Sequence, residues 1–170
     1  MVEPHARNAN PTGVAVNSDA QLAFIYDEAL RGLKQQQSLV ENINSRAGNL
    51  IFAAAFVSSM FANQALPNGI AFWDGVAITL LFVLGVLIVF MLWPIQKYNF
   101  RFDPAELLKA YVDRDSPASV AEMHRELALR IEADRASNWK VIQRLRVALQ
   151  VALILFLLEI LAWVFALAHP

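Results

Sequence analysis

The sequence contains no cysteine among its 170 residues, which excludes disulfides, thiolate metal sites and cysteine nucleophiles. Charged residues are also few, at 17% of the chain against about 25% in typical soluble domains. The net charge is -1, so the basic surplus that nucleic-acid-binding proteins usually carry is absent, and we expect no duplex nucleic acid as a partner. Hydrophobic residues make up 57%, above the roughly 45–50% of soluble domains, and this indicates a membrane protein.

The motifs of common enzyme classes are absent as well. The sequence has no G-x-x-x-x-G-K-[ST], G-x-G-x-x-G, H-E-x-x-H or G-x-S-x-G, which would mark nucleotide, zinc or acyl-transfer sites. The histidines His5, His124 and His169 are scattered along the chain, and for His124 we favour a solvated helical side chain over a metal ligand. We therefore expect neither an enzyme nor a bound cofactor or metal.

Three stretches are apolar and about 20 residues long, enough to cross a hydrocarbon core of about 30 Å. They are residues 47–66, 70–93 and 148–168. The first stretch is the least apolar, so a buried helix of a soluble protein is its alternative interpretation. The residues before it are mostly polar, and we expect no cleaved signal peptide.

Basic residues predict the orientation, because Lys and Arg concentrate in cytoplasmic loops. All 14 of them lie before residue 47 or between residues 94 and 147. We therefore expect the N-terminus inside, the connection between the first two spans outside, a cytoplasmic region at 94–147, and the C-terminus outside. The fold predicted is an all-α membrane protein with three transmembrane helices and long cytoplasmic helical extensions.

Before the first span, residues 1–17 have no hydrophobic periodicity and are expected to be disordered. Ser18 and Gln21 form a capping-box pattern, which predicts an amphipathic cytoplasmic helix over 18–46 that runs on into the span. Its buried row follows alternating steps of four and three residues: Leu22, Tyr26, Ala29, Leu33, Gln36, Val40, Ile43, Ala47 and Leu50. The lone polar Gln36 suggests a coiled coil between copies, and packing on the chain's own cytoplasmic helix is an equal alternative.

Near its start, the region 94–147 contains "YNFRFDP" at residues 98–104, which we interpret as an aromatic membrane anchor in preference to a short extended segment. Asp103 and Pro104 then predict a short helix reaching about Val112. A capping box at Ser119 starts a longer helix that we expect to continue unbroken into the third span. Its apolar stripe is Val120, Met123, Leu127, Ile131, Asn138, Ile142, Leu145 and Leu149.

Glu159 is an ionisable residue near the middle of the third span, where a charge costs about 2.5–3.5 kcal/mol on insertion scales. It is therefore expected to be protonated and hydrogen-bonded, or to face water. One interpretation is a neutral hydrogen bond between helices, and the other is a ring of carboxyls around a pore formed by several copies. The expected pore or gating residues are Glu159, Ser58, Ser59, Thr79 and, at the outer mouth, Asp74.

Oligomerisation is predicted separately, because three helices are too few to enclose an aqueous path. Ala54, Ser58 and Ala62 form a row of small residues that permits close helix approach. Together with the seam of the cytoplasmic helix, this gives the candidate packing residues Ala54, Ala62, Gln36, Leu33 and Val40.

The order of these elements resembles a family of small membrane effectors of bacterial anti-phage systems, the Pycsar-effector transmembrane type and the related SLATT effectors. The matching segments are "ENINSRAGNLIFAAAF", "YNFRFDPAELLKAY" and "HRELALRIEADRASNWKVIQRLRVAL", within about residues 19–168. The resemblance implies an inner-membrane protein that receives a nucleotide signal during infection and permeabilises the membrane. The chain departs from the family in having no separate cyclic-nucleotide-binding domain.

The leading hypothesis is a homo-oligomeric channel or membrane-disrupting effector in the bacterial inner membrane, active in abortive infection. A nucleotide second messenger, its synthase or another partner would gate it through the cytoplasmic helices. Candidate ligand contacts are Arg125, Arg130, Arg135, Lys140 and Arg144, although solvation or anionic headgroups explain these residues more simply. The alternative is a membrane scaffold or accessory subunit without a pore.

Overall fold

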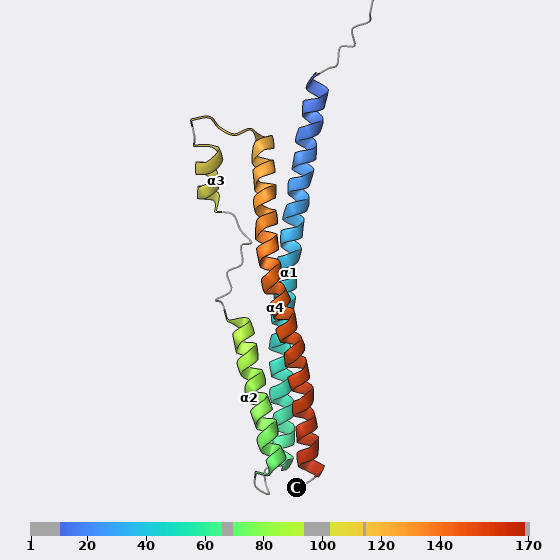
Figure 1. The fold of residues 1–170 in the computed structure, drawn as a ribbon. Helices are drawn as coiled ribbons and strands as arrows, with labels where there is room; N and C mark the ends of the chain where they lie inside the picture. Colours follow the sequence, from blue (N-terminus) through green and yellow to red (C-terminus); the bar gives the residue numbers. More distant parts are fainter. Residues whose placement is uncertain (1–10, 66–69, 94–102, 114, 169–170) are drawn as a thin grey trace, which may run out of the picture. The chain divides into compact units, whose positions relative to one another are not determined.

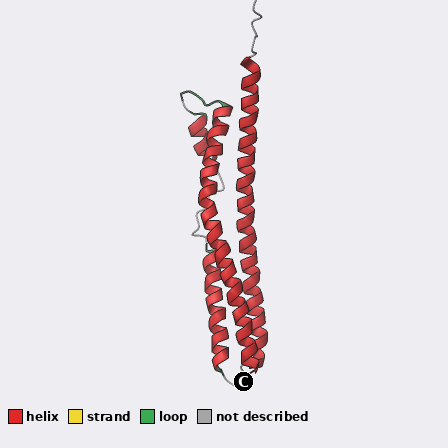
Figure 2. Ribbon diagram, turned by 45° about the vertical axis from the view of Figure 1, so that its right-hand side comes forward, coloured by secondary structure: helices red, strands yellow, loops and turns green. Residues whose placement is uncertain are grey.

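A computed structural model of the chain describes residues 11–65, 70–93, 103–113 and 115–168. These residues form four helices and no strand: α1 (Pro11–Ala65), α2 (Phe72–Leu92), α3 (Pro104–Tyr111) and α4 (Val120–Ala168) (Figures 1 and 2). The predicted all-helical fold is confirmed for this part of the chain. The aromatic segment at 98–102 and the connection at 67–69 lie outside the described residues.

α1 begins earlier than the sequence predicted. The helix starts at Pro11 and not at the Ser18 capping box, so residues 11–17, which we expected to be disordered, are helical. Proline is tolerated here because the first turn of a helix needs no N–H donor from it. From Pro11 the helix continues without a break to Ala65, as the absence of an intervening proline predicted.

The starts of α3 and α4 agree with the sequence. The Asp103 carboxylate accepts a hydrogen bond of 2.9 Å from the Ala105 N–H, and Pro104 is the first helical residue. The Ser119 hydroxyl accepts one of 3.2 Å from the Glu122 N–H. α4 then runs as a single helix of 49 residues, so the predicted continuity with the third apolar stretch is confirmed.

The described chain divides into two compact units. Among the described residues, unit 1 combines 11–35 with 103–113 and 115–136, and unit 2 combines 36–65 and 70–93 with 137–168. In unit 1, Leu33, Leu127 and Ile131 are buried, and the rings of Tyr26 and His124 stack with centroids 5.1 Å apart. In the same unit, Arg130 of α4 forms an ion pair with Glu106 of α3.

Unit 2 consists of parts of α1, α2 and α4 lying side by side (Figures 1 and 2). Its buried side chains are Val40, Ile43, Ala47, Leu50 and Ala54 from α1, Ala77, Leu84, Ile88 and Met91 from α2, and Ile142, Leu145, Ala152, Ala162, Trp163 and Ala166 from α4. Six residues of the seam predicted on α1, from Leu33 through Gln36 to Leu50, are buried, and Leu22, Tyr26 and Ala29 before them are half-buried. Of the stripe predicted on α4, five residues from Leu127 to Leu145 are buried, Met123 and Leu149 are half-buried, and Val120 is exposed. Both stripes are covered within one chain, which corresponds to the self-packing alternative.

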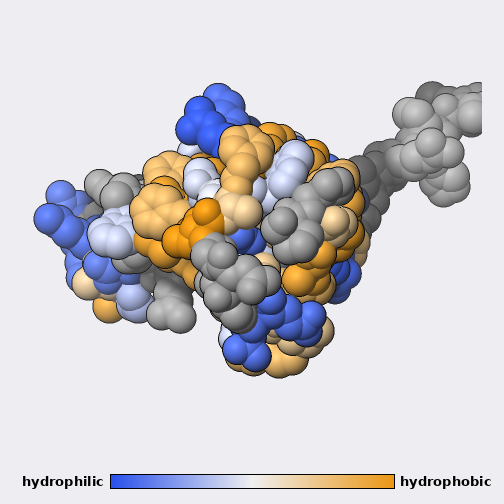
Figure 3. Space-filling view, turned by 90° about the horizontal axis from the view of Figure 1, so that it is seen from below, coloured by the Kyte–Doolittle hydropathy of each residue, from blue (hydrophilic) through white to orange (hydrophobic). Residues whose placement is uncertain are grey.

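Two of the described helices are long and apolar enough to cross a membrane, α2 and α4. The sequence predicted three, and α1 is not among those that qualify, because polar residues interrupt its apolar stretch. Only 22% of the apolar stretch of α2 and 28% of that of α4 is buried. Most of this apolar surface therefore faces outward, and hydrophobic residues occupy much of the surface in Figure 3.

Candidate functional site

A buried polar network connects α1 to α4 inside unit 2. The Ser58 hydroxyl donates to the Glu159 carboxyl oxygen Oε1, and the Trp163 indole N–H donates to the same Ser58 hydroxyl at 3.0 Å. All three side chains are buried, Glu159 completely. The hydroxyl of Ser58 thus acts as acceptor and donor at once, and the three groups form one hydrogen-bonded chain.

The helical repeat explains why these three residues meet. Ser58 continues the buried row of α1 from Leu50 and Ala54 in steps of four, and it therefore faces the interior. Glu159 and Trp163 are four residues apart on α4, which places both on the same face of that helix. The small side chain of Ala54 is also fully buried, and small residues allow two helices to approach closely enough for such short polar contacts.

Trp163, which shares the Ser58 hydroxyl with Glu159, belongs to an apolar cluster. The other members are Ala77, Ala162 and Ala166, and Phe61, Ala62 and Leu80 are among the partly buried residues packed against the cluster. The second carboxyl oxygen of Glu159, Oε2, has no hydrogen-bond partner among the described atoms. Burying an ionised carboxylate without a cation costs far more than burying a neutral carboxyl group. The site is thus built to hold an uncharged acid as a link between two helices.

The rest of the predicted polar belt does not gather around Glu159. Ser59 is exposed, because it lies one residue further around the helix than Ser58. Thr79 is exposed as well, and its hydroxyl donates to the Gly75 carbonyl of its own helix at 2.7 Å. Of the four residues expected at mid-depth, the structure brings together Ser58 and Glu159 only.

Asp74 lies at the start of α2 and is buried. Its Oδ2 accepts a hydrogen bond of 2.7 Å from the Ala71 N–H, while its Oδ1 has no partner among the described atoms. An acid in the first turn is favourable because the helix N-terminus carries a partial positive charge. Asp74 therefore caps α2, and its predicted place at the outer mouth of a pore formed by several copies stays a prediction.

The residues predicted to pack helices together make contacts within the chain itself. Leu33, Gln36, Val40 and Ala54 are buried, and Ala62 packs against the alanine and tryptophan cluster of unit 2. Their faces of α1 are consequently covered by the chain's own helices.

The candidate ligand-binding basic residues differ in their contacts. Arg130 donates to both carboxylate oxygens of Glu106 at 3.1 Å, and this hydrogen bonding and charge raise the pKa of the Arg130 guanidinium. Arg135 pairs with Glu132 at 2.9 Å on the same helix. The other three candidates, Arg125, Lys140 and Arg144, are exposed.

Two features were not found from the sequence. The first is Trp163 as a hydrogen-bond partner, since a tryptophan in an apolar stretch gives no sign of where its N–H points. The second is an outward row on α1, again in steps of four and three, which consists of exposed side chains: Ser45, Asn49, Phe52, Phe56, Ser59 and Asn63. The heptad spacing that predicted the buried seam could have revealed this row.

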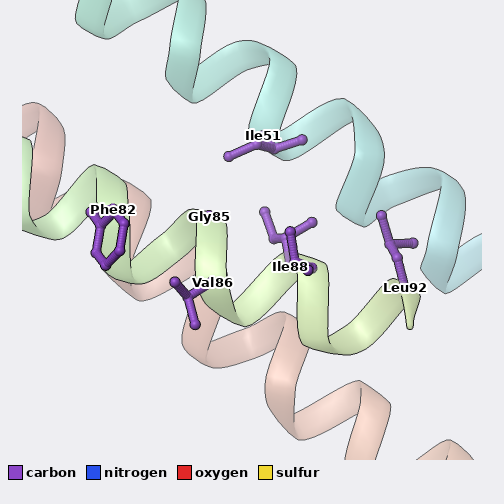
Figure 4. Close-up of a pocket in the computed structure, with 7 residues that line it drawn as sticks. Ile51, Phe82, Gly85, Val86, Ile88 and Leu92 are labelled. Atoms are coloured by element: carbon purple, nitrogen blue, oxygen red, sulfur yellow. The ribbon is translucent and has the colours of Figure 1, made fainter. Parts of the chain in front are cut away.

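The described surface of unit 2 also has an apolar groove of about 460 Å³ between α1 and α2, lined by Ile51, Phe82, Gly85, Val86, Ile88, Val89 and Leu92 (Figure 4). Its lining offers nothing that would bind a polar ligand. Among the described residues, no group of three or more His, Asp or Glu side chains could hold a metal ion. Comparison of the chain with known protein families, with curated proteins and with solved structures found no match.

Proposed function

We propose that the chain is a subunit of a homo-oligomeric membrane channel or membrane-disrupting effector with three spans per copy. The hydrogen bond between Ser58 and Glu159 supports the third span. Glu159 lies within the apolar stretch of α4 that could cross a membrane, and hydrogen-bonded side chains must lie at the same depth. The part of α1 around Ser58 therefore enters the membrane with α4, despite its lower hydropathy.

The observation that carries the channel proposal is the polar outward row of α1. Asn49, Ser59 and Asn63 point away from the chain's own helices, whereas the exposed side chains of α2, apart from Thr79, and those of α4 beyond Gln150 are apolar. Hydrocarbon offers no hydrogen-bond partners to amides and hydroxyls. We infer that this face of α1 borders a water-filled path enclosed by several copies.

In this proposal Glu159 acts by positioning rather than by lining the path. Its side chain is fully buried and bonded to Ser58, and it fixes α1 against α4 so that the outward row keeps its direction. A movement that separates Ser58 from Glu159 would release α1 to turn. Glu159 is thus a gating residue that does not touch the permeating ion.

Unit 1 is proposed to lie in the bacterial cytoplasm, with the N-terminus inside and the C-terminus outside. The distribution of basic residues supports this orientation. A nucleotide signal or a partner protein would act on unit 1 and so move α1 and α4, which both extend into unit 2. The role in anti-phage defence rests on the resemblance described above.

A second candidate is a scaffold or accessory subunit without a pore. The closed network of Glu159, Ser58 and Trp163 favours it, because this network needs no other copy. In unit 1, the exposed Phe24 and Ile25 line an apolar hollow of about 400 Å³ with Ala20 and Gln21. Such a surface suits a protein partner.

Reconstitution in liposomes tests the proposal. The oligomeric mass in detergent and the cation flux would be compared for the wild type, the double variant Asn49→Leu/Asn63→Leu and the control Gln150→Leu, which changes an exposed amide of α4. We expect a defined oligomer whose flux falls in the double variant and stays unchanged in the control. A monomer without flux, or flux insensitive to both asparagines, would contradict the channel and support the scaffold.

A further inference from the structure

The outward row of α1 is not polar along its whole length. Phe52 and Phe56 interrupt it, with 75% and 64% of their surface exposed. Ser45 and Asn49 precede the pair, and Ser59 and Asn63 follow it. The row therefore consists of a polar section, an apolar section and a second polar section.

The spacing places the aromatic pair on the line that joins the polar residues. Steps of four and three residues keep successive members on one face of a helix. At 1.5 Å per residue, Asn49 and Ser59 are about 15 Å apart along the axis, and Phe52 and Phe56 are separated by about one turn. Aromatic anchors of a membrane protein lie at the two interfaces, whereas this pair lies between two polar sections near the depth of Ser58.

We propose that Phe52 and Phe56 of each copy form a hydrophobic gate that closes the path between the two polar sections of α1. The inference rests on the proposed channel function. Narrow apolar constrictions stop ion flow by excluding water, even where the pore is not physically blocked. Rings of phenylalanine from several copies provide such a constriction, while the polar sections hold water on either side.

The buried network controls the direction in which these rings point. Ser58 follows Phe56 by two residues, which corresponds to about 200° around the helix axis. The hydrogen bonds from Ser58 to Glu159 and from Trp163 to Ser58 thus fix the face opposite the gate. Turning α1 about its axis opens the gate only if these bonds break.

The absence of cysteine permits a direct test by accessibility. Single variants Asn49→Cys and Asn63→Cys would be placed in liposomes of known orientation and treated with a charged, membrane-impermeant thiol reagent on the outer side. We expect fast labelling of Asn63→Cys and very slow labelling of Asn49→Cys. Adding Phe52→Ser and Phe56→Ser to Asn49→Cys should raise its labelling rate about tenfold or more, since small barrier changes have such effects.

Flux measurements give the second readout. Phe52→Ser and Phe56→Ser should each raise cation flux above the basal flux of the wild type, whereas Phe52→Leu should leave that basal flux unchanged. Phe82→Ser is the matched control, since Phe82 is 71% exposed on α2 outside the row, and it should leave flux unchanged. Each variant is first shown to form the same oligomer as the wild type.

The outcomes separate the gate from the channel. If the asparagine variants alter flux but the phenylalanine variants change neither flux nor labelling, the gate is wrong and the channel stands. Fast outer labelling of Asn49→Cys with both phenylalanines in place would also overturn the gate. If neither the wild type nor any variant conducts, and no position of the row can be labelled, the channel itself fails and the gate with it.

Discussion

The two units share two helices and a continuous buried seam, yet their outer surfaces differ. In unit 1 the outer face of α4 carries Arg125, Glu126 and Arg130, whereas in unit 2, beyond the exposed basic residues 140 and 144, it carries Leu153, Leu157 and Leu161. Apolar residues recur with the same spacing in both interiors, although the buried polar side chains of the described residues all belong to unit 2. The difference between the outer faces indicates that the two units have different surroundings.

The outer face of α1 in unit 2 is an exception to this contrast. It is neither charged like that of unit 1 nor apolar like that of α2, where Thr79 is an exposed polar residue. Its asparagines and serines have the same spacing as the buried seam. A channel requires such a polar surface on a membrane helix, whereas a simple membrane anchor does not.

The largest effect is expected from removing the core of unit 2. Trp163 is the largest of its fully buried side chains, and Trp163→Ala should cost about 3–5 kcal/mol of unfolding free energy, because it leaves a cavity and deletes a donor. Denaturant unfolding in detergent measures this value. Trp139→Ala is the control, since Trp139 is exposed and should cost much less. Equal losses would show that the packing of unit 2 is not as described.

A smaller effect is expected at two neighbouring serines. Ser58→Ala removes the donor to Glu159 and the acceptor of Trp163, and should cost about 1–2 kcal/mol of unfolding free energy. Ser59→Ala alters the exposed neighbour and should leave the same measurement nearly unchanged. If the two variants were equally stable, the network would not be what holds α1 to α4.

The smallest effect concerns the surface of unit 1. Arg130 and Glu106 are about half exposed, and such pairs are worth about 0.2–1 kcal/mol. A double-mutant cycle of Glu106→Gln and Arg130→Gln should give a coupling energy in this range that shrinks in high salt. A coupling that persists at 1 M salt, where the screening length is about 3 Å, would mean that the pair is shielded from solvent.

Much of the fold could be predicted because it depends on local rules. The caps at Asp103 and Ser119, the unbroken course of α4 and the buried seam through Gln36 follow from residue types and helical spacing. The early start of α1 could not be predicted, since residues 11–17 have no periodicity that marks a helix. The hydropathy of α1 does not qualify it as a membrane span, so the proposal of a third span depends on the bond from Ser58 to Glu159.

The candidate site was only partly predictable for a related reason. Glu159 was identifiable because an acid in an apolar stretch is costly, and Ser58 because it lies at a similar depth. The depth of a residue along a membrane helix does not specify the direction of its side chain. The predicted polar belt therefore also contains Ser59 and Thr79, which are both exposed. Identifying Trp163 as a partner, and identifying the outward row, required knowing which residues are buried. Burial is defined only once the helices are packed together.

The link between Ser58 and Glu159 has an evolutionary consequence. Losing one partner strands a buried polar group, whereas replacing all partners with apolar residues of similar shape can be nearly neutral. Because the buried Trp163 indole N–H also depends on Ser58, descendants of this chain should carry Ser58, Glu159 and Trp163 together or replace all three. Because Ser59 and Thr79 make no such bond, they should drift independently of Glu159.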